Sequence, residues 1–212
     1  MAQAVKTVAE LVVSCLEAEG VEYMFGIPGE ENIRLVDATA GSGIRFILTR
    51  HEQAAAFMAD IYGRLTGRAG VCTATLGPGA INLLLGVADA QTDSTPLVAI
   101  SAQVGLDRIY KESHQIIDLE AMFRPVTKWA STMLTPAAAP EMLRKAFDIA
   151  QSERPGAVYL AIPQDVESAE VSPDATPLPS RPAHAAGPDP DQLAEAIRLL
   201  RRALPVPAPV TS

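Results

Sequence analysis

The sequence predicts an α/β fold, a doubly wound parallel β-sheet flanked by helices. Helical and strand-like segments alternate along residues 1–171, and short loops join them. The strand-like segments are apolar nearly throughout, which is typical of strands buried on both faces of a sheet. An alternating order of this kind places the strands parallel and the helices on the faces of the sheet.

The elements follow one another in a regular order. The first helix is expected at about residues 7–19, and later helices at about 30–40, 52–66, 79–91 and 137–152. Five strands are expected within the segments VEYMFG, IRFIL, GVCTATL, PLVAIS and AVYLAIP. In the third helix, apolar residues at helical spacing predict one buried stripe formed by Ala54, Phe57, Met58, Ile61 and Leu65. Asp60 and Arg64 fall outside this stripe.

A change of composition predicts the domain organisation. Residues 1–171 are expected to form one domain, and residues 172–190, which are rich in proline and small residues, a linker. Residues 191–212 hold one amphipathic helix, with Asp189 or Asp191 as its cap, followed by a proline-rich end. Because one helix cannot bury its own apolar stripe, we expect this segment to be the remnant start of a truncated second domain.

Composition and charge exclude several classes of function. No apolar run approaches the roughly 18 residues that suggest a membrane span, and the first residues lack the pattern of a secretory signal. A soluble, cytoplasmic protein is therefore expected. The net charge is -8 with scattered Lys and Arg, so neither nucleic acid nor a membrane is an expected partner.

Cysteine and histidine do not suggest a metal centre. Cys15 and Cys72 fall in a predicted helix and a predicted strand, where free cysteine usually packs as a small hydrophobic residue. The three histidines, His51, His114 and His184, show no metal-ligand spacing with one another or with the cysteines. We therefore expect reduced core cysteines and no metal held by side chains of this chain.

Three strand-to-helix loops are unusual, and such loops line the ligand crevice of an open parallel sheet. They read GIPGEEN, TRHEQ and LGPGAIN, in chain order. Their glycines permit close approach of the backbone to a ligand, although tight turns into helices would need the same residues. None matches GxGxxG or GxxxxGK[ST], so a mononucleotide cradle is not supported.

Glu52, in the second loop, has two interpretations. Thr49 and Glu52 fit the S/T-x-x-E capping box, in which both side chains satisfy N–H groups at a helix start. Alternatively, Glu52 is an acid placed in the crevice for chemistry. The local pattern leaves both interpretations open.

The order of motifs is more specific than any single loop. GIPGEEN, TRHEQAAAFMADIYGRLTGRAGV, TLGPGAINLLLGVADAQTDSTPLVAISAQV, ESHQIIDLEAMFRPVTKWA and RPGAVYLAIPQDV follow one another over about residues 5–171. This succession resembles the N-terminal pyrimidine-binding domain of thiamine-diphosphate enzymes, most closely the large, catalytic subunit of acetolactate synthase.

The resemblance implies roles for particular residues. Glu52 matches the acid that bonds N1′ of the cofactor's aminopyrimidine ring and so promotes deprotonation of the thiazolium carbon. The implied cofactor-binding positions are Glu52, Gly29, Pro28, Pro78, Gly79 and Asn82.

Further positions match the same family pattern. Gln115 matches a glutamine beside the reacting carbon, and His114 precedes it as in the flavin-independent, catabolic branch. His114 can equally be a solvent-facing loop residue, and His51 either orients the site or packs structurally. Lys128 and Arg154 also match family positions; a solvated strand-end charge is the alternative for Lys128, and Arg154 matches a contact to a flavin.

The implied reaction is that of the complete enzyme: decarboxylation of pyruvate and transfer of the two-carbon unit to a second 2-oxo acid, as in branched-chain amino acid biosynthesis. Thiamine diphosphate is the implied cofactor, and Mg²⁺ the metal, held through a G-D-G…N motif that these 212 residues lack. FAD is not supported. The resemblance also implies a homodimer or higher homo-oligomer, so the isolated chain is expected to bind cofactor feebly and to lack carboligase activity.

Two other functions remain open. One is another thiamine-diphosphate enzyme, such as a 2-oxo acid decarboxylase or sulfoacetaldehyde acetyltransferase, which an assay panel would separate. The other is a truncated, non-catalytic dimerisation module, which a monomeric sedimentation profile would count against.

Overall fold

A six-stranded parallel sheet forms the centre of the molecule. The structure is a computed structural model that describes residues 6–181 and 187–203. The strands lie in the order β2-β1-β3-β4-β6-β5, and each neighbouring pair of strands is parallel. Their bounds are β1 Tyr23–Gly26, β2 Arg45–Leu48, β3 Gly70–Ala74, β4 Leu97–Gln103, β5 Trp129–Thr132 and β6 Ala157–Pro163. The predicted fold class is confirmed.

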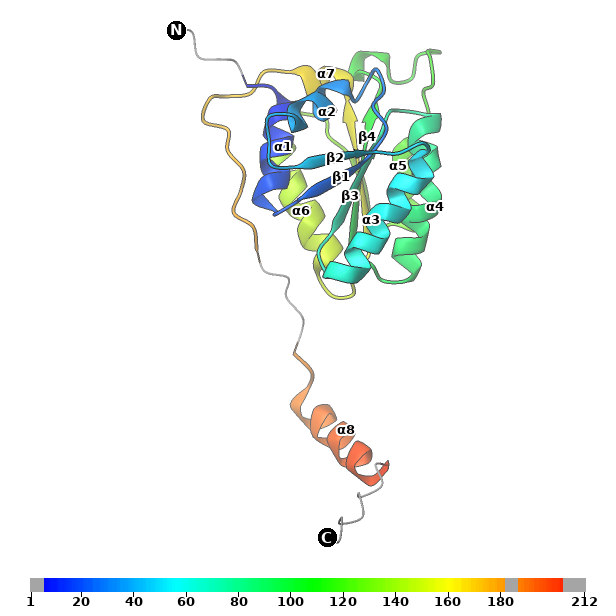
Figure 1. The fold of residues 1–212 in the computed structure, drawn as a ribbon, viewed down its shortest axis with the longest axis vertical. Helices are drawn as coiled ribbons and strands as arrows, with labels where there is room; N and C mark the ends of the chain where they lie inside the picture. The colour runs from blue at the N-terminus through cyan, green and yellow to red at the C-terminus, as the bar shows by residue number, and fades with distance from the viewer. Residues whose placement is uncertain (1–5, 182–186, 204–212) are drawn as a thin grey trace.

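Helices cover both faces of the sheet, as Figure 1 shows. Their bounds are α1 Val8–Ala18, α2 Ile33–Thr39, α3 Glu52–Thr66, α4 Pro78–Thr92, α5 Leu119–Phe123, α6 Ala139–Gln151, α7 Gln164–Ser168 and α8 Pro190–Ala203. One core cluster gathers side chains of α1 and α6 against the sheet, and a second gathers those of α3 and α4. Two separate cores, one on each face, are what a doubly wound sheet requires.

The five strands expected from the sequence are present, and each expected helix lies within a few residues of its predicted bounds. The short elements β5, α5 and α7 were not predicted. The four residues of β5 are only partly buried, apart from Ala130, so their sequence carries no continuous apolar run. A short strand without an apolar run is poorly marked in a sequence.

The predicted buried stripe of α3 is wrong. Met58, Ile61 and Leu65 are 43%, 51% and 82% exposed, whereas the buried face consists of Ala55, Ala56, Ala59, Asp60 and Gly63. Small residues face inward because α3 packs tightly: a Cβ on Gly86 of α4 would lie 2.6 Å from the Ala56 Cβ. A close helix–helix contact selects small side chains, and the bulky ones are left outside.

Buried polar groups include Asp60 of α3, whose carboxylate accepts a hydrogen bond from Nε of Arg64 at 2.7 Å. The same guanidinium reaches Asp89 and Asp93 on and just after α4, at 2.9 Å and 2.6 Å. Arg64 thus ties α3 to α4 through three carboxylates. Both residues were expected outside the buried face, and for Asp60 this expectation is wrong.

Both cysteines are buried and free, as expected. Burial raises the pKa of the Cys15 thiol to about 11 and raises the pKa of Cys72 further. Neither thiol is therefore ionised near neutral pH, and both act as core side chains.

The C-terminal part of the described chain contains one exposed helix. The Asp189 carboxylate accepts from the N–H groups of Asp191 and Gln192, each at 3.0 Å, so Asp189 is the cap of α8. All residues of α8 are exposed. The boundaries 1–171, 172–190 and 191–212 stay a prediction, and His184 and the proline-rich end lie outside the described residues. None of the helices described here is long and apolar enough to cross a membrane.

Candidate functional site

The three unusual loops meet at one edge of the sheet. β1 lies between β2 and β3, with Gly26 opposite Leu48 on one side and opposite Thr73 on the other. The loops that follow these strands therefore leave the same carboxyl edge side by side. The chain reverses its direction of winding between β1 and β3, which is where open α/β sheets bind ligands.

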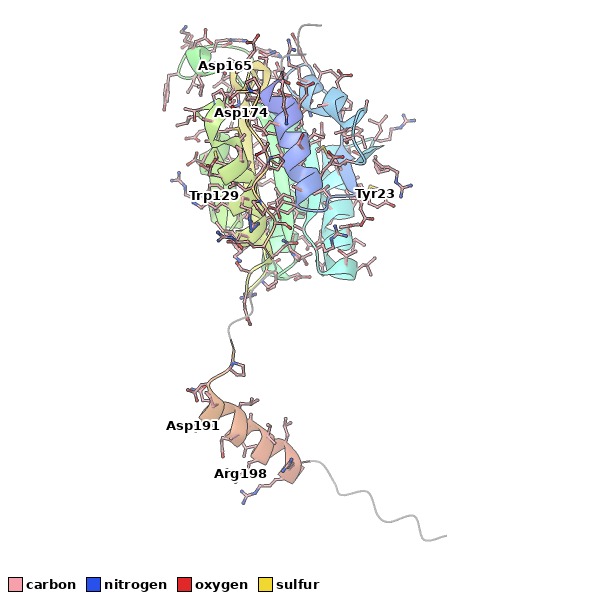
Figure 2. The ribbon with its side chains drawn as sticks, turned by 90° about the vertical axis from the view of Figure 1, so that its left-hand side faces the viewer. Tyr23, Trp129, Asp165, Asp174, Asp191 and Arg198 are labelled. Atoms are coloured by element: carbon pink, nitrogen blue, oxygen red, sulfur yellow. The ribbon has the colours of Figure 1, made fainter. Side chains whose placement is uncertain are left out.

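Figure 2 shows the orientation of this edge. Asp165 of α7, which follows β6, is at the upper end, and Tyr23 and Trp129, the first residues of β1 and β5, lie below it. The carboxyl edge is thus at the top of both figures, with α7 and α2 beside it in Figure 1.

The capping-box interpretation of Glu52 is wrong. α3 begins at Glu52 with His51 as its N-cap, and the His51 Nδ1 accepts from the Gln53 N–H at 3.1 Å. Thr49 is buried, and its hydroxyl donates to the carbonyl oxygens of Gly26 and His51. Because threonine ties the end of β2 to β1 and histidine caps the helix, the Glu52 carboxylate is free for another role.

Glu52 pairs with Asn82 instead. The Asn82 Nδ2 donates to the Glu52 Oε2 at 2.9 Å, which joins the first residue of α3 to the second turn of α4. The other oxygen, Oε1, lies 3.4 Å from the position that a Cβ on Gly79 would occupy, and it accepts no hydrogen bond from the described residues. A half-buried carboxylate with one free oxygen beside a glycine can exchange a proton with a ligand that enters there.

The loop after β1 is shaped by a buried asparagine. Asn32 is 1% exposed; its Oδ1 accepts from the Gly29 N–H at 2.6 Å, and its Nδ2 donates to the Ile27 carbonyl at 3.2 Å. Pro28, at the tip between these residues, is exposed. Gly29 itself faces β3, because a Cβ there would lie 2.5 Å from the Thr75 Cβ.

The loop after β3 needs glycine for a conformational reason. Gly77 has φ 58°, and a Cβ on it would lie 2.5 Å from the Gln115 carbonyl oxygen. Gln115 therefore lies against this loop through its backbone and Cβ, and Gln115 and His114 are both exposed. Pro78 is exposed at the first position of α4, where proline costs no hydrogen bond.

Thr75 is a site residue that the sequence did not reveal. Its hydroxyl donates to the Glu31 Oε2 at 2.8 Å, and its side chain touches the positions that Cβ atoms on Gly29 and Gly79 would take. Thr75 thus joins the first loop to the third. A threonine within a strand-like segment has no pattern of its own, and only the pairing of β1 with β3 makes it central.

Two residues that match family positions lie elsewhere. Lys128 precedes β5 at the amino edge, where its Nζ donates to the Ile149 and Ser152 carbonyls at the end of α6. Burial lowers the pKa of Lys128. Arg154 also lies at the amino edge, with its guanidinium donating to Ser94 and Thr92. Neither contacts Glu52 or Asn82.

A cavity of about 600 Å³ lies beside the site. It is lined by the last residues of β4 and β5, Gln103 and Thr132, and by the segment between these strands, which includes Ile116. Glu52 and Asn82 are not part of its lining, so it neighbours the glycine loops without containing the carboxylate. Among the described residues there is no group of three or more His, Cys, Asp or Glu side chains that could hold a metal ion.

The comparison with family models agrees with this geometry. Residues 6–122 match the family described as "Thiamine pyrophosphate enzyme, N-terminal TPP binding domain". The match covers more than half of the chain and includes all three loops.

Curated relatives extend the match. The chain is 43% identical over 173 residues to the "Probable acetolactate synthase large subunit" of Methanocaldococcus jannaschii, covering 82% of this chain and 29% of the relative. It is 42% identical over 191 residues to the catabolic acetolactate synthase of Raoultella terrigena, covering 89% and 34%. It is also 40% identical over 171 residues to a "Probable 2-ketoarginine decarboxylase" of Pseudomonas aeruginosa, covering 79% and 31%. The chain thus spans about a third of the length of these relatives.

Proposed function

Since this chain belongs to the thiamine pyrophosphate enzymes and contains their N-terminal cofactor-binding domain, we propose that it supplies the pyrimidine-binding half of an acetolactate synthase. Acetolactate synthases from several organisms are 41–46% identical to it. The proposed reaction is decarboxylation of pyruvate and transfer of the two-carbon unit to a second 2-oxo acid.

The observation that carries this proposal is the Glu52–Asn82 pair at the shared loop edge. Glu52 would share a proton with N1′ of the aminopyrimidine through its free Oε1, while Asn82 fixes the direction of the carboxylate. Gly79 allows Thr75 and the Glu52 carboxylate to lie close together, and Gly29, Pro28 and Pro78 stand in the two flanking loops. Bound thiamine diphosphate supplies the electron sink for decarboxylation, and the chain orients it.

Gln115 and His114 have a weaker structural basis. Gln115 lies against the loop of Gly77 and can approach a substrate bound beside the cofactor. His114, next to it, is exposed and would reach the site only in a larger assembly. We propose both as substrate-facing residues. Mg²⁺ and the cofactor's diphosphate would be held by a C-terminal domain like that of the longer family members, and FAD is not part of the proposal.

Another copy of the chain is the expected protein partner. Met58, Ile61 and Leu65 form one exposed apolar stripe on α3, the helix that carries Glu52. Apolar side chains in such a row favour a self-complementary contact. Sedimentation velocity of the chain should show a dimer that Ile61→Glu dissociates, while Leu134→Glu, which places the same charge at an exposed leucine outside α3, should leave it intact. A native chain that stays monomeric at all concentrations would contradict this part.

A decarboxylase is the alternative that one observation favours, namely the 40% identity to the relative described as a 2-ketoarginine decarboxylase. The two proposals differ in the acceptor: a decarboxylase releases an aldehyde, whereas a synthase joins the two-carbon unit to a second 2-oxo acid. A panel of 2-oxo acids, with both aldehyde and acetolactate measured, separates them.

The main test needs the chain in an extended protein, joined to the C-terminal part of the Raoultella terrigena relative. Calorimetric titration of thiamine diphosphate with Mg²⁺ should show weak or no binding to the chain alone and clear binding to the extended protein. Glu52→Gln should abolish turnover there while the fold persists, and Glu153→Gln, which changes an exposed acid before β6 at the opposite edge of the sheet, should leave turnover unchanged. Unchanged turnover of the Glu52 variant removes Glu52 from the mechanism.

A further inference from the structure

Asn32 occupies the N-cap of α2 without capping it. Asparagine at this position ordinarily accepts from an N–H of the first helical turn. Here the Asn32 side chain makes no such bond, because it is turned back to Gly29 and Ile27 in the preceding loop. The residue best suited to cap α2 therefore shapes the loop beside the candidate site.

A distant residue supplies the missing cap. The Glu167 Oε1 accepts from the Leu35 N–H, the third residue of α2, at 2.6 Å and across 132 positions of sequence. Glu167 belongs to α7, which packs on α2 at the carboxyl edge (Figure 1) and leaves this carboxylate 2% exposed. A carboxylate at a helix N-terminus satisfies a free N–H and interacts favourably with the helix dipole.

A chain of contacts leads from this loop to Glu52. Gly29, which Asn32 holds, lies against Thr75, since a Cβ on Gly29 would be 2.5 Å from the Thr75 Cβ. Thr75 in turn lies against Gly79, and the Gly79 position is next to the Glu52 Oε1. A change in the conformation of residues 27–32 would therefore alter the space in front of the carboxylate.

We propose that Glu167 is a positioning residue: by capping α2 from α7, it frees Asn32 to hold residues 27–32 in the conformation that borders Glu52. The structural half of this inference, that Glu167 caps α2 and Asn32 holds the loop, rests on the hydrogen bonds of these two side chains. The affinity half, that the loop conformation affects cofactor binding, rests on the proposed function.

The neighbouring acid of α7 offers a matched control. The Asp165 Oδ2 accepts from the Leu106 N–H at 3.0 Å, in the segment after β4. Asp165 thus also connects α7 to another backbone segment, but not to residues 27–32. Changes at Asp165 test whether disturbance of α7 alone is sufficient.

The first experiment follows amide hydrogen exchange in the isolated chain by NMR. Glu167→Leu should speed exchange at Leu35 and, because Asn32 returns to the helix end, at Gly29 by roughly fivefold each. Glu167→Gln keeps an acceptor oxygen and should restore slow exchange at both. Asp165→Leu should leave both amides unchanged. Native exchange rates at Gly29 and Leu35 in the Glu167→Leu chain would overturn the proposal.

If Glu167→Leu does not fold, the variant Asn32→Ala tests the same proposal. In Asn32→Ala, exchange at Gly29 should become faster while exchange at Leu35 stays slow, because Glu167 still caps the helix. Faster exchange at Leu35 to the same degree as at Gly29 would show that Asn32 is the cap after all, and would overturn the proposal.

The third measurement concerns the cofactor in the extended protein. Glu167→Leu should raise the KM for thiamine diphosphate about fivefold and leave kcat at saturating cofactor unchanged, and Glu167→Gln should restore the KM. A lower kcat with an unchanged KM would indicate a merely structural role and overturn the inference. Absence of cofactor binding by the unchanged extended protein would instead refute the proposed function and the affinity half, while the exchange results would still decide the structural half.

Discussion

The free energy of unfolding of this chain should depend on pH through Glu167. Burial raises the pKa of this carboxyl to about 7, from an ordinary value of 4.5, against the opposing effects of the Leu35 N–H and of Arg34. The folded chain therefore retains the Glu167 proton at pH values at which the unfolded chain has released it. The stabilising contribution is complete below pH 4.5 and is lost as the pH rises through about 7.

The size of this effect follows from the pKa difference. One pKa unit corresponds to about 1.4 kcal/mol, so a rise from 4.5 to about 7 corresponds to a loss of about 3 kcal/mol in the free energy of unfolding. Glu167→Gln has no proton to release and retains an oxygen that can accept from the Leu35 N–H. The variant should match the native chain near pH 4 and exceed it by about 3 kcal/mol near pH 8.

Urea unfolding at a series of pH values, followed by circular dichroism, measures the difference between the two chains. Glu170→Gln, which removes an exposed acid just beyond α7, controls for the loss of one negative charge. A difference between Glu167→Gln and the native chain that stays constant from about pH 4 to pH 8 would refute the reasoning, because desolvation of Glu167 would then not be coupled to folding.

Three further changes test the packing. Arg144→Met should lower the free energy of unfolding by about 3 kcal/mol. The Glu19 carboxylate, which is 4% exposed and pairs with the guanidinium at 2.9 Å, would lose its partner. Urea unfolding should show that the double variant with Glu19→Leu regains most of this free energy. Gly70→Ala should lower the free energy of unfolding by more than about 2 kcal/mol, since its Cβ would lie 2.0 Å from a backbone oxygen of α3, whereas Gly41→Ala meets no atom within 4 Å and should be nearly neutral. Thr7→Ala removes the capping box of α1 and should lower the melting temperature by an amount equivalent to about 1 kcal/mol; an unchanged melting temperature would exclude a stabilising cap.

Much of the fold could be predicted because buried parallel strands have an unmistakable pattern. β3, β4 and β6 are buried along their whole length, and such strands read as continuous apolar runs. β5 escaped prediction because its four residues, Trp-Ala-Ser-Thr, carry no continuous apolar run. β2, at the other edge of the sheet, has such a run within RFIL and could be predicted although its residues are partly buried or exposed.

The candidate site could be predicted in its location but not in its contacts. The glycine-proline loops and Glu52 stand at strand ends, and strand order brings them to one edge. Asn82 lies 30 positions from Glu52, Glu31 lies 44 positions from Thr75, and Glu167, which caps α2, lies 132 positions from Leu35. No local pattern specifies such pairs, since they depend on which strands lie side by side.

The sequence by itself determined the alternation of elements, the parallel sheet and the three loops at its carboxyl edge, because these follow from short-range periodicity and turn chemistry. Tertiary structure alone decided which face of α3 is buried and which side chain caps α2. On α3, close packing against α4 placed alanine and glycine inside and left Ile61 and Leu65 exposed. At the start of α3, the pairing of β1 with β2 engaged Thr49 and left the Glu52 carboxylate to Asn82. The local sequence pattern predicted a capping box there, but the Thr49 hydroxyl instead donates to the Gly26 carbonyl at the end of β1.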